Sequence, residues 1–308
     1  MLGLKRLVWW TMIGMFVVVV AGDLVTNTQS GHGCGNSWPL CNGAVVPTFN
    51  WHTTIEYSHR AVSGLEGLAV VLSAWLVWRR LPRPDVRVLA VAALVFLFAQ
   101  VFLGAGAVVF NEPPLLLAAH MGVSFSAFGS LLLLYRIVAR AAHGQGAPPD
   151  VPRATRLWVW GGLAAVYALI FTGGYVRHTA SGLGCGTEWP LCEGSLWGSL
   201  TGPAAQQMVH RGLAAGVGLF VLAMALHLAR SQKGRPDLVR LGWTAVGLVL
   251  GQALVGGITV LSNLGLAEIS LHSATAALFF SALLVLSYEV APLGWRQARP
   301  DPVATAVR

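Results

Sequence analysis

Charged residues are scarce in this sequence. Asp, Glu, Lys and Arg make up 10% of the 308 residues, whereas hydrophobic residues make up 55%. A soluble globular protein of this length needs more polar side chains to cover its surface. The composition therefore excludes a soluble protein and indicates an all-α, polytopic membrane protein, whose helices satisfy their own backbone hydrogen bonds in lipid.

Eight apolar stretches are each long enough to cross a hydrocarbon core of about 30 Å, which takes about 20 helical residues. We predict transmembrane helices over residues 7–25, 55–78, 87–110, 114–138, 157–176, 206–230, 238–261 and 266–289. Lys5 and Arg6 precede the first stretch, as basic residues do in a signal peptide. We nevertheless expect this helix to be retained, because its counterpart in the repeat described below is internal and cannot be cleaved.

Acidic residues are outnumbered, with 12 Asp and Glu against 20 Lys and Arg and a net charge of +8. Of the 20 basic residues, 17 fall in the two termini and in or beside the connections 79–87, 139–156 and 230–240. By the positive-inside rule these segments are cytoplasmic and the other connections face outward. The positive charge thus indicates a protein of the cell membrane, whose partner is the lipid bilayer, and does not indicate nucleic acid.

Cysteine is also scarce, and its four occurrences lie in two copies of one loop. The stretch SGHGCGNSWPLCNG at 30–43 returns as SGLGCGTEWPLCEG at 181–194. Both loops are predicted on the outer, oxidising side, where disulfides form. The simplest interpretation is two local disulfides, Cys34 with Cys41 and Cys185 with Cys192. A redox-active disulfide and a zinc site are the alternatives, although only His32 stands near as a further zinc ligand.

The cysteine loops belong to a longer internal repeat. At an offset of 151 residues the dipeptide His-Arg at 59–60 falls on His-Arg at 210–211, and one inserted residue later His120 falls on His272. We therefore predict two tandem four-helix bundles, residues 1–140 and 157–308, joined by a polar linker at 141–156. Because four is an even number, both bundles insert the same way up and are related by a pseudo-twofold axis along the membrane normal.

Four of the nine histidines share three properties: they are paired by the repeat, they lie in predicted helices, and they sit in the outer third of the membrane. These are His59, His120, His210 and His272. A polar side chain inside a bilayer is costly and usually functional. Two imidazoles at one level on facing helices can supply both axial ligands to a haem iron. Hydrogen bonds to neighbouring helices and a proton or metal-ion pathway are the alternatives.

The other five histidines are expected to be ordinary. Four are placed in loops and one near the cytoplasmic end of the sixth helix: His32, His52, His143 and His178, and His227.

Arg60 and Arg211 directly follow the first histidine of each pair, on the membrane side that is poor in cations. A guanidinium near the aqueous rim can bind a haem propionate through two hydrogen bonds. An arginine that only reaches to the membrane interface is the alternative.

One difference between the halves concerns acidic residues. Glu56, three residues before His59 and on nearly the same helical face, is replaced by Gln207 in the second half. A carboxyl group in only one half suggests that one site performs chemistry while the other carries electrons, and a buried carboxyl suits proton transfer. A glutamate hydrogen-bonded to a loop is the alternative. Glu66 lies deeper in the same helix, and Val217 stands at the equivalent position of the second half. The role of Glu66 stays open between pairing with an arginine and lining a hydrated crevice.

Taken together, these features resemble the haem A synthase family, the membrane enzymes that convert haem O to haem A for terminal oxidases. The resemblance spans the chain and rests on the eight helices, the duplicated cysteine loop, EYSHR at 56–60, His120 in LAAHMG, His-Arg at 210–211 and Leu-His at 271–272. Glu66 is outside the family motif.

The resemblance implies an oxidoreductase that oxidises one porphyrin CH group, a methyl, to a formyl group. It implies a haem b cofactor on His210 and His272, and substrate haem O on His59 and His120 with Glu56 as the catalytic carboxylate. It also implies an electron donor or acceptor of unknown identity, with haem O synthase and oxidase assembly factors as candidate protein partners. A diheme b-type electron-transfer protein and a transporter with parallel repeats are the competing classes.

Overall fold

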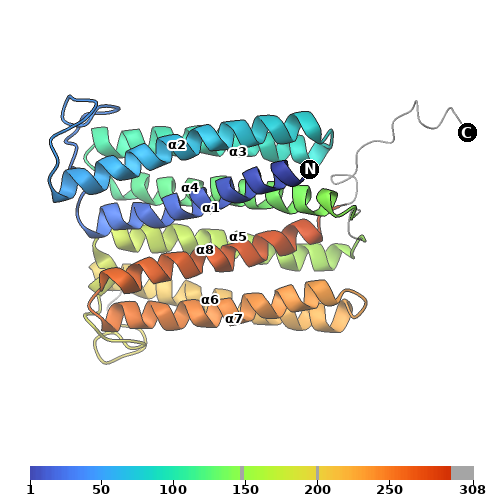
Figure 1. The fold of residues 1–308 in the computed structure, drawn as a ribbon. Coiled ribbons are helices and arrows are strands. Elements are labelled where there is room, and N and C mark those ends of the chain that lie inside the picture. The colour runs from blue at the N-terminus through green and yellow to red at the C-terminus, as the bar shows by residue number, and fades with distance from the viewer. Residues whose placement is uncertain (146–148, 199–200, 293–308) are drawn as a thin grey trace, which may run out of the picture.

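The computed structural model describes residues 1–145, 149–198 and 201–292 (Figure 1). Within these ranges the chain forms α1 (Leu2–Asn27), α2 (Trp51–Arg80), α3 (Pro84–Val109), α4 (Pro114–Ala142), α5 (Arg153–His178), α6 (Gly202–Ser231), α7 (Pro236–Leu261) and α8 (Leu266–Glu289), with a short 3-10 helix, η1, at Ser181–Leu183. All eight α-helices are long and apolar enough to cross a membrane. The predicted all-α membrane fold is therefore confirmed, and each predicted span lies within an observed helix except for one residue at the end of α3.

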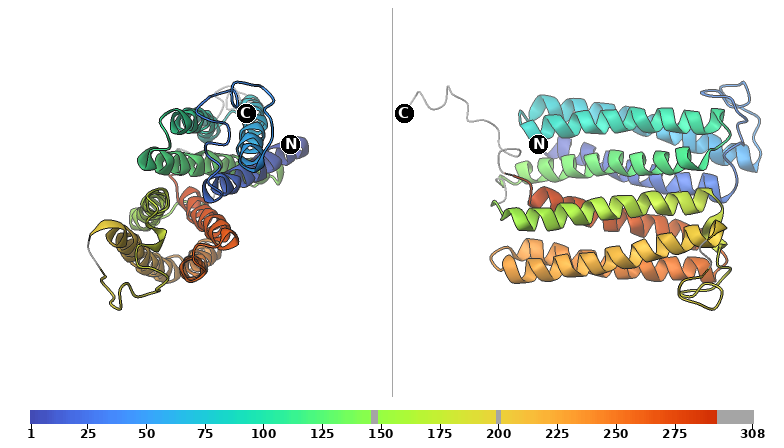
Figure 2. Two further views of the ribbon diagram at one scale, coloured as in Figure 1. Left: turned by 90° about the vertical axis from the view of Figure 1, so that its left-hand side faces the viewer. Right: turned by 180° about the vertical axis from the view of Figure 1, so that it is seen from behind.

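The helices form two groups, α1 to α4 and α5 to α8 (Figures 1 and 2). In the first group α1 contacts α2 and α4, and α3 contacts the same two helices; α5, α6, α7 and α8 pack in the same cyclic order. The groups meet where α1 and α4 pack against α5 and α8. A twofold relation between them, and a domain boundary at 141–156, stay predictions. Residues 146–148 of that linker and the C-terminal segment 293–308 lie outside the described residues.

Local sequence explains where several helices begin. Proline stands within the first two positions of α3, α4, α6 and α7, where its missing N–H leaves no hydrogen bond unmade. At the start of α2 the side chain of Asn50 accepts a hydrogen bond of 2.9 Å from the backbone N–H of Thr53. This N-cap satisfies one of the backbone N–H groups that the first turn of α2 leaves without a partner.

The buried core runs along the middle of the molecule. Leu131 and Leu134 of α4 and Leu283 and Leu286 of α8 are all fully buried, because these helices lie where the two groups meet. Outer helices instead present large apolar side chains outward, such as Phe102, which is 70% exposed. Such exposure is unfavourable in water but not in lipid.

Ion pairs join the two groups at the ends of their helices that the charge distribution predicts to be cytoplasmic. The buried carboxylate of Glu289, the last residue of α8, accepts a hydrogen bond of 2.8 Å from Arg136 of α4 and also contacts Arg140. Arg235, which precedes α7, is 3.9 Å from the same carboxylate. One glutamate thus ties α8 to α4 and to the connection before α7.

Candidate functional site

Both predicted disulfides are present, Cys34–Cys41 and Cys185–Cys192. All four cysteines are at most 4% exposed, which favours a structural role over exchange with a redox partner. Because the sulfurs are joined to each other, the zinc alternative is wrong. The two loops also have the same backbone features. Each has a cis peptide bond between Trp and Pro, and each has an isolated β-bridge between its second cysteine and the residue three positions later.

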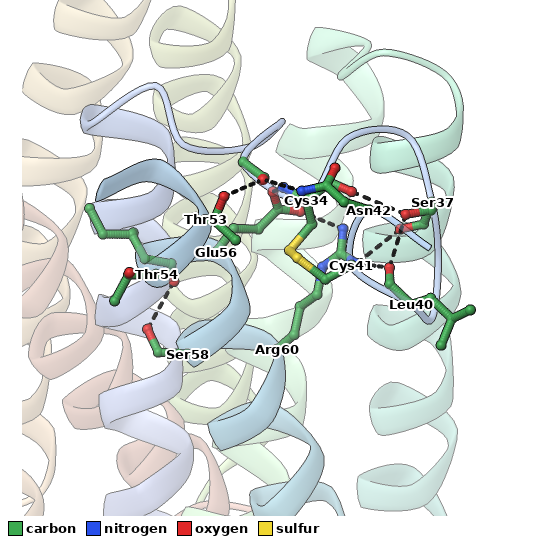
Figure 3. The surroundings of a disulfide bond; sticks show 12 residues. Cys34, Ser37, Leu40, Cys41, Asn42, Thr53, Thr54, Glu56, Ser58 and Arg60 are labelled. Atoms are coloured by element: carbon green, nitrogen blue, oxygen red, sulfur yellow. Dashed lines mark hydrogen bonds and ion pairs between the residues drawn. A yellow bond between two sulfur atoms is a disulfide. The ribbon is translucent and has the colours of Figure 1, made fainter. Parts of the chain in front are cut away.

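Each loop is fastened to the helix that follows it by the side chain at the Glu56 or Gln207 position. The Glu56 carboxylate accepts a hydrogen bond of 2.7 Å from the backbone N–H of Cys34, as Figure 3 shows. Gln207 accepts the equivalent bond of 2.7 Å from Cys185. The loop contact that was the alternative for Glu56 is therefore present, and its catalytic role stays a prediction.

The two arginines complete this attachment. Arg60 donates hydrogen bonds of 3.0 Å to the carbonyl oxygens of Ser37 and Leu40 and forms an ion pair with Glu56 (Figure 3). Arg211 donates to the carbonyls of Glu188 and Leu191, at 2.8 and 2.9 Å. Both guanidinium groups thus hold the loops, and propionate binding by Arg60 and Arg211 stays a prediction.

The four repeat-paired histidines lie at matched positions in their helices. His59 and His210 each stand eight residues after the first residue of α2 and α6, and His120 and His272 stand six residues after the first residue of α4 and α8. At a rise of about 1.5 Å per residue, offsets of eight and six residues correspond to depths along the helices that differ by only about 3 Å. Within each bundle the two imidazoles interact electrostatically. The structure thus brings the predicted residues together in two pairs.

A glycine on a neighbouring helix faces each of these imidazoles. A methyl group on Gly104 would lie 3.1 Å from Cε1 of His120, and one on Gly256 would lie 2.8 Å from Cε1 of His272. Gly22 and Gly173 stand in the same relation to the histidines of α2 and α6, at 3.5 and 3.0 Å. These repeat-paired glycines let the rings pack against backbone, a role that the sequence did not reveal.

His210 has a hydroxyl partner on α5. Thr172 of α5 donates its only hydroxyl hydrogen to the carbonyl of Leu169, at 2.9 Å, and lies 3.1 Å from Nδ1 of His210. With its hydrogen on that carbonyl, the threonine oxygen can accept from Nδ1–H of His210. In that tautomer Nε2 of His210 keeps its lone pair, as an imidazole that binds a metal requires.

His272 also has a side-chain partner. The Gln252 amide nitrogen is 3.3 Å from both ring nitrogens and donates to the His272 carbonyl at 3.0 Å. The Gln252 oxygen accepts a short hydrogen bond from Thr275. Both imidazoles of the second bundle are therefore held by neighbouring polar side chains.

The first bundle lacks these supports. Nδ1 of His59 and Nδ1 of His120 are buried and have no hydrogen-bond partner among the described residues. Ala21 occupies the position equivalent to Thr172, and Gln100, the equivalent of Gln252, donates to Met15 at 3.8 Å. His120 also has a hydrogen bond to the backbone of Gln100. Among the described residues, the Nδ1 atoms of the first bundle's imidazole pair therefore lack the side-chain partners that the second bundle supplies.

A buried ion pair joins the bundles at this level. Arg177 of α5 forms a short ion pair with Asp23 of α1 and donates to the Asp23 carbonyl at 2.7 Å. Arg177 also interacts electrostatically with His272, and His178 with His120. Neither Asp23 nor Arg177 has an equivalent in the repeat, so repeat pairing could not reveal them.

Two histidines placed in loops from the sequence are helical. His52 lies in the first turn of α2 and His178 is the last residue of α5, so both placements were wrong. His227 is within α6, as expected, and contacts Thr155 at 3.2 Å.

The protein thus has two groups of transmembrane helices, and each group has a pair of imidazoles and a loop closed by a disulfide. These features place it in a class of polytopic membrane proteins suited to binding haem. The family model described as cytochrome oxidase assembly protein, COX15-CtaA, matches residues 5–285, and the chain belongs to this family.

Several curated proteins are similar over nearly their whole length. The heme A synthase of Shouchella clausii (strain KSM-K16) is 38% identical over 287 residues, covering 91% of this chain and 95% of the relative. The heme A synthase of Halalkalibacterium halodurans is 38% identical over 280 residues, covering 89% and 92%. That of Bacillus licheniformis is 37% identical over 285 residues, covering 91% and 93%.

Proposed function

We propose that this protein is a haem A synthase, which oxidises a methyl group of haem O to the formyl group of haem A for a terminal oxidase. The relatives named heme A synthase and the family match support this function. Within the structure, the observation that carries it is the presence of two imidazole pairs with unequal surroundings.

The second bundle suits a resident haem b. His210 and His272 would ligate it, and Thr172 lies where its oxygen can accept from Nδ1–H of His210 and leave Nε2 to iron. Side chains that fix the orientation of a ligating imidazole also strengthen metal binding. When bound, this haem would supply one-electron transfer.

The first bundle suits a haem that enters as substrate and leaves as product. His59 and His120 would orient haem O, and their unpartnered Nδ1 atoms allow the rings to adjust as the ligand exchanges. Glu56 stands one helical turn before His59 and has one carboxylate oxygen on Cys34 and the other on Arg60. It would hold or receive a proton released during the oxidation, while the cysteine loop limits the entry of water.

The two competing classes explain less. A diheme electron carrier needs both histidine pairs but gives no reason for Glu56 in one bundle and Gln207 in the other. A transporter gives no reason for two imidazole pairs at matched positions in their helices. We further propose that the protein lies in the cell membrane with its termini and basic connections cytoplasmic and its cysteine loops outside, and that an electron-transfer partner, haem O synthase and oxidase assembly factors act with it.

The direct test is conversion of haem O. The protein is produced in a host that makes haem O but not haem A, and the extracted haems are separated chromatographically. We expect haem A with the unchanged protein and none with His59→Ala. Formation of haem A without His59, or its absence from the unchanged protein supplied with haem O, would contradict the proposal.

A further inference from the structure

The polar face of α2 continues below the imidazole of His59. Ser63 and Glu66 follow at intervals of four and three residues, so their side chains project on the same side of the helix as His59. Glu66 is seven residues from His59, or about 10 Å further into the membrane. The function proposed above uses neither residue.

Both side chains have hydrogen-bonding atoms with no partner. Ser63 Oγ and Glu66 Oε1 are buried and make no hydrogen bond to any described residue. A polar atom left unpaired in an apolar environment is expensive, on the order of 1–3 kcal/mol for each group. Two such atoms one helical turn apart therefore indicate a ligand that supplies the missing bonds.

The structure makes room for the Glu66 carboxyl group. It lies against Gly14 of α1, where a methyl group would overlap it. At the equivalent positions the second bundle has Ala165 in place of Gly14, Val217 in place of Glu66 and Ala214 in place of Ser63. The space and both polar groups thus occur only in the bundle to which we assign the substrate.

The polar face ends soon after Glu66. The next six residues of α2, 67–72, are all apolar or glycine. Ser73 then bonds Thr11 at 2.9 Å, and Thr11 also bonds the carbonyl of Leu7 at 3.0 Å. Because these hydroxyl groups already have partners and are separated from Glu66 by two helical turns, an isolated binding site fits better than a continuous proton path.

The substrate assigned to this bundle has one polar group that belongs inside the membrane. The propionates of haem O are charged and require the aqueous rim, whereas its hydroxyethylfarnesyl chain is apolar apart from a hydroxyl group close to the ring. That hydroxyl, absent from haem B, needs a hydrogen-bond partner at the depth where the macrocycle meets the membrane interior.

We propose that Glu66 and Ser63 bind the hydroxyl group of the hydroxyethylfarnesyl chain and thereby distinguish haem O from haem B. The inference rests on the proposed function, because it needs haem O on His59 and His120. A site built to bond a hydroxyl group rejects the analogue that lacks it, since its own polar atoms are then left unpaired. Glu66 and Ser63 are thus specificity-determining residues.

The test compares binding of haem O and haem B by spectral titration of the purified protein whose second bundle already holds haem. We expect the unchanged protein to prefer haem O, and the variant Ser63→Ala/Glu66→Val to lose about tenfold to a hundredfold of that preference. This variant carries the residues that the second bundle has at these positions, so the fold accommodates them. Glu66→Gln keeps a hydrogen-bonding group and should retain most of the preference. A proton-transfer role instead predicts that Ser63→Ala/Glu66→Val leaves the ratio of affinities unchanged and only slows haem A formation.

A second variant displaces the carboxyl group without removing it. Gly14→Ala should lower the preference for haem O because the added methyl group moves the flexible Glu66 side chain. An unchanged ratio of affinities in both Ser63→Ala/Glu66→Val and Gly14→Ala would overturn the inference. Loss of haem O binding on His59→Ala, measured in parallel, shows whether the substrate site itself is correctly assigned, so the two proposals fail separately.

Discussion

Replacing Glu56 with glutamine separates the loop contact of this residue from its proposed chemistry. Gln207 makes the same hydrogen bond to Cys185 that Glu56 makes to Cys34, both at 2.7 Å. The variant Glu56→Gln should therefore keep the bond to the cysteine loop. It removes only the negative charge and the capacity to hold a proton.

The expected effect on stability is small. The variant weakens the pairing with Arg60, which keeps its hydrogen bonds to the carbonyls of Ser37 and Leu40. We expect a loss of about 1 kcal/mol in the free energy of unfolding, the size of one typical hydrogen bond. Glu56→Leu leaves the buried N–H of Cys34 without a partner as well, which adds about 1–3 kcal/mol.

The activity of Glu56→Gln should fall much further than its stability. If Glu56 takes up or releases a proton in the reaction, Glu56→Gln should form haem A about 100-fold to 10,000-fold more slowly, the usual range for loss of a general acid or base. The assay measures haem A formed per bound haem, and unfolding by denaturant in detergent is followed on the same samples. The reverse outcome, full activity in Glu56→Gln together with destabilised Glu56→Leu, would show that the residue only fastens the loop.

Three further predictions concern the supports of the imidazoles and the junction of the bundles. Thr172→Ala should weaken haem retention by the second bundle about 10-fold to 100-fold, because His210 loses the partner that orients it. Transfer of haem to a haem-scavenging protein measures the retention, and an unchanged rate would count against assigning the resident haem to His210. Gly104→Ala should weaken haem O binding in spectral titration, since its methyl group would lie 3.1 Å from the imidazole it faces; wild-type affinity would show that the ring has room to move. Arg177→Met should cost about 3–5 kcal/mol in denaturant unfolding by leaving Asp23 buried and unpaired, and the double variant Asp23→Leu/Arg177→Met should recover part of it; equal stability of the single variant and the unchanged protein would refute a stabilising pair.

The sequence predicted the fold well because lipid imposes simple requirements. Long apolar stretches gave all eight helices, and α8 matched its predicted limits at 266–289. Repeat pairing also found the disulfides and brought out the four histidines, since residues copied with a bundle occupy equivalent places in both copies. His59 and His210 accordingly lie eight residues after the first residue of their helices.

What the sequence could not predict depends on contacts between helices. Arg60 was expected at a propionate, but whether its guanidinium also reaches loop carbonyls depends on how the loop folds back. Asp23 and Arg177 lie 154 positions apart and have no repeat equivalents, so nothing in the linear pattern joined them. The role of Thr172 depends on its contact of 3.1 Å with Nδ1 of His210, which only the folded structure shows. The sequence does offer one signal for this role, because Ala21 stands in the first half at the position equivalent to Thr172.

The central claim is that the two histidine pairs are unequal, one holding a resident haem and the other an exchangeable one. The most direct measurement is the optical spectrum and extracted haem content of two double variants produced with ample haem. We predict that His210→Ala/His272→Ala loses the tightly bound haem B, whereas His59→Ala/His120→Ala keeps it and loses haem O and haem A. Retention of all haem by the first variant, or the same loss in both, would contradict the account.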